Sequence, residues 1–288
     1  MSTYSDNSFN TSHYNLARPS YPDEFYKTLM EYHDSKGKAR GLAVDIGCGS
    51  GFVTFKLGKY FQKVVGTDIS EKMIQQCKEQ NESDGVSFCV ASAEESPKEI
   101  LAGTVDLLTG AECCHWVDHP KFFAESYRVL QPGGTLAYWF YKDPIFVGNP
   151  VANEIYERYC YGSDSSEGYE KYMGPVWQQP GRDYLRTLLK EIIVPESQFK
   201  DVIRHEFHAE EDQKSDTTLY ISRRATLKDL LGYTKSWSAY HTWMKLYGAD
   251  HKDVAERFVD ELREAMGWSD DYEFELVWDT VYTFATKR

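Results

Sequence analysis

Three glycines stand at alternate positions in the segment VDIGCGSG, as Gly47, Gly49 and Gly51. Glycine lets the backbone approach a ligand closely, and a helix that begins at Phe52 would offer amide donors at its N-terminus. Asp45 ends the preceding apolar segment, where its carboxylate can hold a positively charged amino group. The segment predicts a site for a small charged ligand, although a glycine turn can also serve packing alone.

A second acidic residue, Asp68, ends the next apolar segment, 17 residues after Gly51. A carboxylate at this place accepts hydrogen bonds from both hydroxyls of a ribose, or it caps the helix that follows. The spacing is GxGxG and not the GxGxxG of dinucleotide folds, and Asp45 would bring negative charge close to a pyrophosphate. We therefore predict S-adenosylmethionine as the cofactor, and nicotinamide is the weaker interpretation.

The ends of the third and fourth predicted strands add to this site. Ser92 can hydrogen-bond an exocyclic amine and the backbone near Ala93 can meet an adenine edge, whereas Glu94 fits a solvated loop equally well. Glu112 lies in GAECCHW, and this segment should lie beside the transferable methyl group because open α/β sheets bind ligands at the carboxyl ends of their strands. The residues expected to bind the cofactor are Asp45, Gly47, Cys48, Gly49, Gly51, Asp68, Ile69, Met73, Ser92, Ala93 and Glu112.

The same segment places Cys113, Cys114 and His115 side by side. Adjacent residues cannot easily converge on one tetrahedral ion and no second pair follows, so we expect no metal. His115 and Trp116 are candidates for positioning the acceptor, together with His241, although packing under the cofactor explains the first two equally well. No residue is assigned as catalytic with certainty.

These residues need a sheet to position them, and the alternation of short apolar and amphipathic segments over residues 41–141 is typical of one. The predicted strands are residues 42–46, 63–68, 86–91, 104–110, 135–140, 202–207 and 273–287. We predict an α/β fold: a Rossmann-like, seven-stranded, mostly parallel sheet with an antiparallel C-terminal strand, and inserted helices that form a substrate cap.

The length of 288 residues suits one large domain with insertions. We expect a single methyltransferase domain over residues 1–288. Residues 1–35 would form an N-terminal lid and first helix, residues 41–141 the cofactor-binding core, and residues 145–200 and 210–270, approximately, the substrate cap. Residues 226–266 should be helical because apolar side chains recur there at helical spacing.

The net charge of −13 disfavours a nucleic-acid substrate, because such an enzyme must neutralise phosphates. No apolar segment is long enough to span a bilayer, and the polar N-terminus does not resemble a secretory signal, so we expect no membrane partner and a cytoplasmic location. The six cysteines lack paired spacing and are interpreted as reduced thiols. The oligomeric state stays open, with a monomer compatible.

Several segments resemble the fungal trans-aconitate methyltransferase family, a branch of the class I S-adenosylmethionine-dependent methyltransferases. They are FNTSHYNLARPSYPDEFY near the N-terminus, VDIGCGSG, GAECCHW, DPIF at 143–146, GPVWQQPGR at 174–182 and KSWSAYHTW at 235–243. They are also similar to a sister fungal enzyme that methylates cantharidin-type dicarboxylates. Ser92 departs from the acid that many members of the superfamily carry there.

This resemblance implies methylation of a small carboxylic acid, with the substrate held by basic and aromatic side chains. Arginine matches a carboxylate bidentately, and Arg182 is the preferred candidate among Arg182, Arg223, Arg224 and Lys235. Arg18 would belong to a lid formed by Tyr14 to Tyr21, and Tyr14, Trp139 and His241 would join the aromatic walls. The residues expected to bind substrate are Arg18, Tyr21, Tyr141, Arg182, Trp237 and Tyr240.

Two other functions remain open at this point. A hydroxylated acceptor would require a general base such as His115 or His241. A protein that binds S-adenosylmethionine without turnover would keep the same glycine turn.

Overall fold

A computed structural model describes residues 18–37, 39–163 and 168–288 of the chain. At its centre lies one sheet with the strand order β3-β2-β1-β4-β5-β8-β6, and β7 also pairs with β8. The first five strands pair in parallel, whereas β8 runs antiparallel to β5, β6 and β7. The strands are β1 (Leu42–Ile46), β2 (Lys63–Asp68), β3 (Val86–Val90), β4 (Val105–Ala111), β5 (Leu130–Phe146), β6 (Phe199–Phe207), β7 (Ile221–Ala225) and β8 (Phe274–Lys287).

The predicted α/β fold with a mostly parallel sheet and an antiparallel C-terminal strand is confirmed, with one strand more than expected. Two short strands share one edge of β8, where β6 pairs with residues 280–287 and β7 with residues 274–278. The sequence ISRRA of β7 has two arginines and little apolar alternation, so only its pairing with β8 explains the strand.

The core is divided between the two faces of the sheet. Along β5, Ala137, Trp139 and Tyr141 belong to one hydrophobic cluster, whereas Leu136 and Phe140 belong to the other. This alternation follows from the period of two along a strand. Because both faces are covered, β5 is apolar on both sides, as expected for a central strand.

The helices begin where the sequence offers caps. Ser70 accepts a hydrogen bond from the backbone N–H of Met73 at 3.4 Å, and Thr226 accepts one from Asp229 at 3.3 Å. The helices are α2 (Asp23–Asp34), α3 (Phe52–Leu57), α4 (Glu71–Gln80), α5 (His119–Val129), α6 (Pro150–Tyr161), α7 (Gly181–Arg186), α8 (Leu227–Lys235), α9 (Ser238–Tyr247) and α10 (Val254–Met266). No helix in the described part of the chain is long and apolar enough to span a bilayer.

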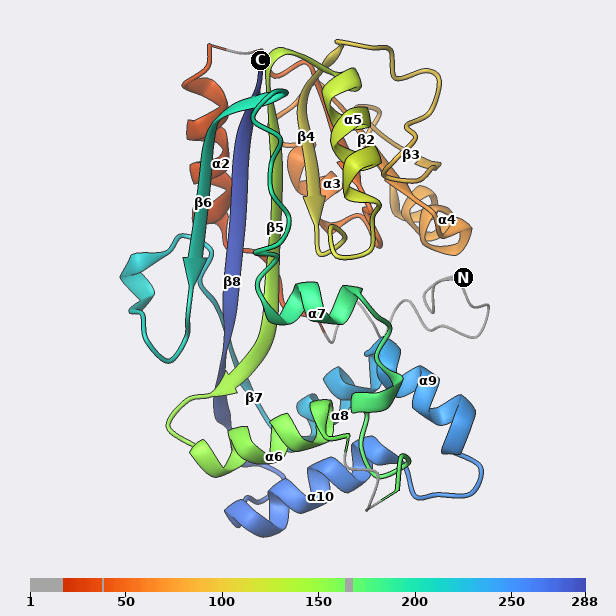
Figure 1. The fold of residues 1–288 in the computed structure, drawn as a ribbon, viewed down its shortest axis with the longest axis vertical. Helices are drawn as coiled ribbons and strands as arrows, with labels where there is room; N and C mark the ends of the chain where they lie inside the picture. The colour runs from red at the N-terminus through yellow and green to blue at the C-terminus, as the bar shows by residue number, and fades with distance from the viewer. Residues whose placement is uncertain (1–17, 38, 164–167) are drawn as a thin grey trace.

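The helices form two groups (Figure 1). Helices α2 to α5 flank the sheet in the upper part of the view, whereas α6, α8, α9 and α10 gather in a lower lobe beyond the carboxyl ends of the parallel strands. Strands β5 and β8 are long enough, at 17 and 14 residues, to reach from the sheet into that lobe. Helix α7 lies between the two groups and contacts β5.

The pairing of β5 with β8 is interrupted at one place. The register shifts between Tyr141 and Pro144, so Lys142 and Asp143 lie in an irregularity of the strand. Such bulges re-aim side chains and are common beside active sites. Here the irregularity lies where the sheet passes into the helical lobe.

Candidate active site

A cavity of about 550 Å³ lies at the carboxyl ends of β1, β2 and β4. The glycine turn forms part of its wall, and Gly47 and Gly49 have φ angles of 57° and 53°. A Cβ atom on Gly47 would lie 2.5 Å from the Cβ atom of Cys113, so both the backbone angle and the close approach require glycine here. Nine of the residues expected to bind the cofactor line this cavity: Asp45, Gly47, Cys48, Gly49, Asp68, Ile69, Met73, Ala93 and Glu112.

Gly51 and Ser92 are not among the residues that line the cavity. Gly51 is the N-cap of α3, with φ at 86°, and a Cβ atom there would lie 2.8 Å from the ring of Phe55, so its role is in packing. Ser92 forms an isolated bridge with Glu95, whereas its neighbours Ala91 and Ala93 face the cavity. The third strand also ends at Val90, one residue earlier than expected.

Asp45 is 1% exposed and lines the cavity. Its carboxylate accepts hydrogen bonds from the hydroxyls of Thr54 at 2.6 Å and Thr109 at 2.8 Å. Burial raises the pKa of Asp45 to about 7, and these two hydrogen bonds oppose the rise. A cation beside this carboxylate would stabilise its ionised form.

Asp68 connects the two segments that carry the strongest sequence signals. Its Oδ2 atom accepts from the backbone N–H of Gly49 at 2.9 Å and its Oδ1 atom accepts from Ser70 at 2.8 Å. The N-cap of α4 is Ser70, so Asp68 is not the cap of that helix. Burial raises the pKa of Asp68, and both amides oppose the rise. Each carboxylate oxygen keeps a lone pair for a further donor.

A second, smaller cavity of about 70 Å³ adjoins the first. We call it the acceptor chamber. Four residues line both cavities: Arg18, Glu112, Trp116 and Tyr141. The other residues of the acceptor chamber are His115, Lys142, Asp143, Trp177, Arg182, Leu185, Tyr233, Trp237 and Ser238. The chamber therefore joins β4 and β5 of the sheet to α7, α8 and α9.

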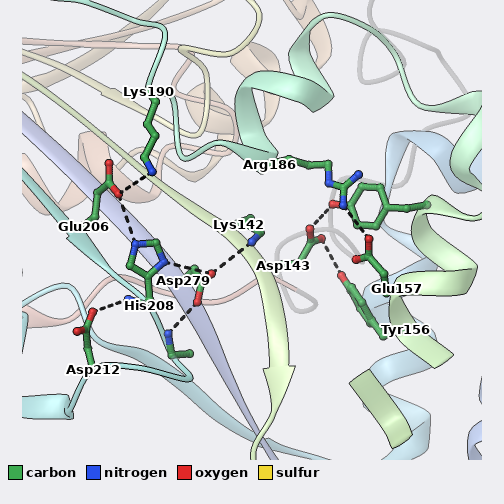
Figure 2. Close-up of polar contacts among 12 residues, drawn as sticks. Lys142, Asp143, Tyr156, Glu157, Arg186, Lys190, Glu206, His208, Asp212 and Asp279 are labelled. Atoms are coloured by element: carbon green, nitrogen blue, oxygen red, sulfur yellow. Dashed lines mark hydrogen bonds and ion pairs between the residues drawn. The ribbon is translucent and has the colours of Figure 1, made fainter. Parts of the chain in front are cut away.

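Arg182 lines this chamber, but its guanidinium group is not free to bind a substrate carboxylate. It is 7% exposed, its Nη2 atom lies 2.7 Å from Oδ1 of Asp143, and its guanidinium lies 3.8 Å above the ring of Trp177. Asp143 also accepts from Tyr161 and from Tyr156, the latter at 2.9 Å, and Figure 2 shows the Tyr156 contact. Burial would raise the pKa of Asp143, but Arg182 and both tyrosines hold it below its ordinary value. The charge of Arg182 is thus already balanced.

Lys142 is the neighbouring cation in the irregular segment of β5. Its Nζ atom lies 3.4 Å from Oδ2 of Asp279 on β8. Asp279 also accepts from the backbone N–H of Ala209 at 2.8 Å and lies 3.9 Å from Nδ1 of His208 (Figure 2). Because Asp279 has three polar neighbours, its carboxylate does not depend on the lysine alone. Lys142 lines the acceptor chamber and is 28% exposed.

The other predicted substrate residues divide between the chamber and the core. Arg18 lies 3.4 Å from the hydroxyl of Tyr141 and 5.5 Å from the ring centre of Tyr233. Tyr21 lines the larger cavity and Trp237 the acceptor chamber. Tyr240 lines neither cavity, since its hydroxyl donates to Asp253 at 2.9 Å, and the neighbouring His241 also lines neither.

The remaining expectations are placed elsewhere in the molecule. Trp139 is 1% exposed and packs in the core, and Tyr14, with the rest of the lid before Arg18, lies outside the described residues. Arg223, Arg224 and Lys235 line neither cavity and form ion pairs with Asp229, Glu273 and Asp253, respectively. The described residues contain no group of His, Cys, Asp and Glu suited to a metal.

His115 and Trp116 lie together in the loop after β4, with their rings 4.5 Å apart. His115 is 8% exposed, and its Nδ1 atom has no hydrogen-bond partner among the described residues. Burial lowers the pKa of His115 to about 3, and the charges of Arg182 and Arg18 add to this effect. The imidazole is therefore neutral near pH 7.

Sequence reasoning missed Lys142, Trp177 and Tyr233 as cavity residues. Lys142 had a usable signal, because the rule that ligands bind at the carboxyl ends of parallel strands applies to the fifth strand as well as the fourth. Trp177 follows a short 3-10 helix and Tyr233 lies on α8. No such rule applies to either residue, and only tertiary packing brings them to the chamber.

Comparisons with known proteins agree with this geometry. Residues 44–138 match the family described as "Methyltransferase domain". A Saccharomyces cerevisiae protein named as a probable S-adenosylmethionine-dependent methyltransferase is 31% identical over 297 residues, which cover 99% of this chain and 98% of that protein. The chain belongs to the class I S-adenosylmethionine-dependent methyltransferases.

Further similarities extend over most of this methyltransferase. A Dictyostelium discoideum protein that is also named as a methyltransferase is 30% identical over 257 residues, covering 89% of this chain and 84% of that protein. The structure of an Anaeromyxobacter dehalogenans protein described as a type II methyltransferase has a TM-score of 0.66 and 24% identity, and covers 92% of this chain and 97% of the other. That second similarity shows that the fold is shared over most of the chain.

S-adenosylmethionine is the cofactor of this methyltransferase, and the larger cavity suits it in charge. The cofactor carries positive charge on its sulfonium and amino groups. The cavity wall contains the acids Asp45, Asp68, Glu94 and Glu112 against the cations Arg18 and Lys56. Such a wall favours a cationic ligand over a pyrophosphate.

Proposed function

We propose that this methyltransferase makes the methyl ester of a small di- or tricarboxylic acid, trans-aconitate or a related compound. The observation that carries the proposal is the composition of the acceptor chamber. Arg18 and Lys142 gather there beside the ion pair of Arg182 with Asp143, in a chain whose net charge is −13. An acidic protein that collects cations beside its cofactor cavity is suited to a small anion.

The cofactor would be held by the residues around the larger cavity. Asp68 offers its carboxylate to the ribose hydroxyls and Asp45 offers negative charge to the amino group. Gly47 and Gly49 give the backbone room to approach, while Ala91 and Ala93 border the adenine. Trp116 and Tyr141, which line both cavities, would then lie beside the transferable methyl group.

The acceptor's carboxylate would lie at the junction of the two cavities, near Arg18, while Lys142 holds a second carboxylate deeper in the chamber. A carboxylate is already ionised near pH 7, so it needs no general base. The neutral His115 is compatible with this, because no proton has to be removed. Alignment and exclusion of water would provide most of the acceleration.

The lower lobe of α6, α8, α9 and α10 would act as the substrate cap, with residues of α7, α8 and α9 closing the chamber. Trp237 and Ser238 enter the chamber from the start of α9, and Tyr233 from α8. Two insertions, approximately residues 145–200 and 210–270, supply these segments. The single domain thus has a core that holds cofactor and a cap that selects the acid.

The decisive experiment measures S-adenosylhomocysteine release with trans-aconitate, cis-aconitate, citrate, isopropylmalate and cantharidic acid, with mass spectrometry of each product. The expected product gains one methyl group and loses it in mild alkali, as an ester does and an ether does not. Binding of the cofactor without turnover of any acid would overturn the proposal. An alkali-stable product would reassign the acceptor to a hydroxyl group.

A further inference from the structure

Glu112 holds an unusual position in the backbone at the end of β4. Its φ angle is 55°, in the left-handed region that non-glycine residues seldom adopt. Strained residues of this kind collect at functional sites, where the surrounding structure compensates for their cost. Glu112 is also one of the four residues that line both cavities, and among those four it is the one that carries a carboxyl group.

The hydrogen bonds of Glu112 commit one carboxyl oxygen and leave the other available. Oε1 accepts from the backbone N–H of Tyr141 at 2.5 Å. No hydrogen bond from the described residues reaches Oε2. Glu112 lines both cavities. A carboxyl group with one oxygen that accepts and one oxygen without a partner among the described residues matches the pattern of a protonated acid, in which the carbonyl accepts and the hydroxyl donates.

The surroundings of Glu112 favour the neutral form. Burial raises the pKa of Glu112 well above its ordinary value, while the hydrogen bond from Tyr141 and the charge of Arg18 oppose the rise. Asp143 is the other carboxyl group of the acceptor chamber, and its charge is engaged by Arg182. A second ionised carboxylate at the junction would repel an anionic acceptor.

We propose that Glu112 is a carboxylic acid that donates a hydrogen bond through Oε2 to the carboxylate undergoing methylation. This inference rests on the proposed function. During transfer, a bond forms between a carboxylate oxygen and the methyl carbon, the bond between that carbon and sulfur breaks, and its electron pair stays on sulfur. The proton of Glu112 does not move. Glu112 orients the acceptor through the oxygen that does not react.

The amide of glutamine has the same pattern as the protonated acid, which gives a sharp test. In Glu112→Gln the side-chain carbonyl can accept from Tyr141 and the NH₂ group can donate to the acceptor. We expect kcat/KM for the best acid of the panel to stay within about threefold of the original enzyme. In Glu112→Ala the donor is lost, and kcat/KM should fall by about 10- to 100-fold. Glu99→Gln removes an exposed carboxylate and serves as the matched control.

Folding and cofactor binding are measured separately, by thermal melting and by calorimetry with S-adenosylmethionine. If Glu112→Ala fails to fold, the comparison of Glu112→Gln with the original enzyme decides alone. A fall of 10-fold or more in Glu112→Gln, with cofactor affinity retained, would overturn the inference, because it would mean that the enzyme needs an ionised carboxylate at this position.

Proton release distinguishes failure of this inference from failure of the proposed function. Methylation of a carboxylate releases no proton, whereas methylation of a hydroxyl releases one proton per turnover, which a pH-stat records. If the original enzyme releases no proton and Glu112→Gln is active, both proposals are supported. If the original enzyme releases no proton and Glu112→Gln is inactive, only the role of Glu112 is refuted. If the original enzyme releases one proton per turnover and Glu112→Gln is inactive, both proposals are refuted and Glu112 acts as a base.

Discussion

The cofactor cavity and the acceptor chamber adjoin, yet they are constructed differently. Most of the cofactor cavity comes from residues 45–117, in the short loops that follow β1, β2, β3 and β4. The acceptor chamber draws on residues 18, 112–116, 141–143, 177–185 and 233–238, which come from the loop after β4, the irregular end of β5, α7 and the lower lobe, together with Arg18. The cofactor cavity is formed mainly by residues that are close in sequence, whereas the acceptor chamber forms only when the sheet, α7 and the lower lobe pack together.

The charges around each cavity are opposite in sign to the charge of the ligand proposed for it. With Glu112 neutral, the acids Asp45, Asp68 and Glu94 face two cations around the cofactor cavity, whereas three cations face the single carboxylate of Asp143 around the acceptor chamber. A cationic cofactor and an anionic acid would each be attracted to its own cavity. The comparison suggests that evolution can change the acid by altering the long-range chamber while the cofactor cavity stays intact.

The largest effect should come from breaking the buried ion pair of the acceptor chamber. Arg182→Met leaves Asp143 buried with only tyrosine donors, and removing one partner of such a pair costs about 3–5 kcal/mol of unfolding free energy. Chemical denaturation measures this loss. The double variant Asp143→Asn/Arg182→Met removes both charges and should recover most of it. A stable Arg182→Met with only a raised KM for the acid would mean that Arg182 binds a substrate carboxylate directly.

Asp68→Ala tests the independence of the cofactor cavity. The variant loses the acceptor of the Gly49 and Ser70 amides and of the ribose hydroxyls, so the Kd for S-adenosylmethionine should rise by about 10- to 100-fold. Calorimetry gives that value, and the KM for the acid should not change. Asp84→Ala, on the exposed surface before β3, is the matched control. An altered preference among acids would show that the two cavities are coupled.

The same division explains how much could be predicted from the sequence. Asp45, Gly47, Gly49 and Asp68 were expected together and line one cavity, because strand ends and glycine spacing are local signals. Ser92 was expected beside Ala93 but does not line the cavity, since the alternation of side chains in the loop depends on where β3 ends.

The acceptor chamber could be predicted only in part. Arg182 was expected to bind a substrate carboxylate. Its partner Asp143 lies 39 residues earlier, and nothing local in the sequence indicates their pairing. Tyr240 was expected in the wall, although α9 directs its hydroxyl to Asp253. For Lys142 the strand-end rule gave a usable signal, whereas the register shift between β5 and β8, in which the residue lies, is a property of two strands together and could not be predicted locally.

His115 gives a third test, through pH. Its pKa in the folded state, about 3, lies below the unfolded value of about 6.5, so the unfolded chain binds a proton first as pH falls. The stability that the neutral imidazole contributes is complete above pH 6.5 or so and is lost toward pH 3, by about 1.4 kcal/mol per pH unit. From pH 6.5 to 5 the original protein should therefore lose about 2 kcal/mol that His115→Asn does not lose. Denaturation at each pH measures this, with the exposed His251→Asn as control. Equal slopes for the original protein and His115→Asn would mean that His115 is hydrated in solution.

The smallest effect should come from Lys142, whose ammonium group is partly exposed and shares Asp279 with the backbone N–H of Ala209. If Lys142 holds the second carboxylate, Lys142→Met should raise the KM for a dicarboxylate by about fivefold, the worth of about 1 kcal/mol for a partly screened ion pair. A half-ester of the same acid lacks the distal charge, so its KM should not change. Lys142→Arg keeps the cation and should restore the dicarboxylate preference in part. If Lys142→Met raises both KM values equally, the lysine supports the irregular segment of β5 and the distal carboxylate must be held elsewhere in the chamber.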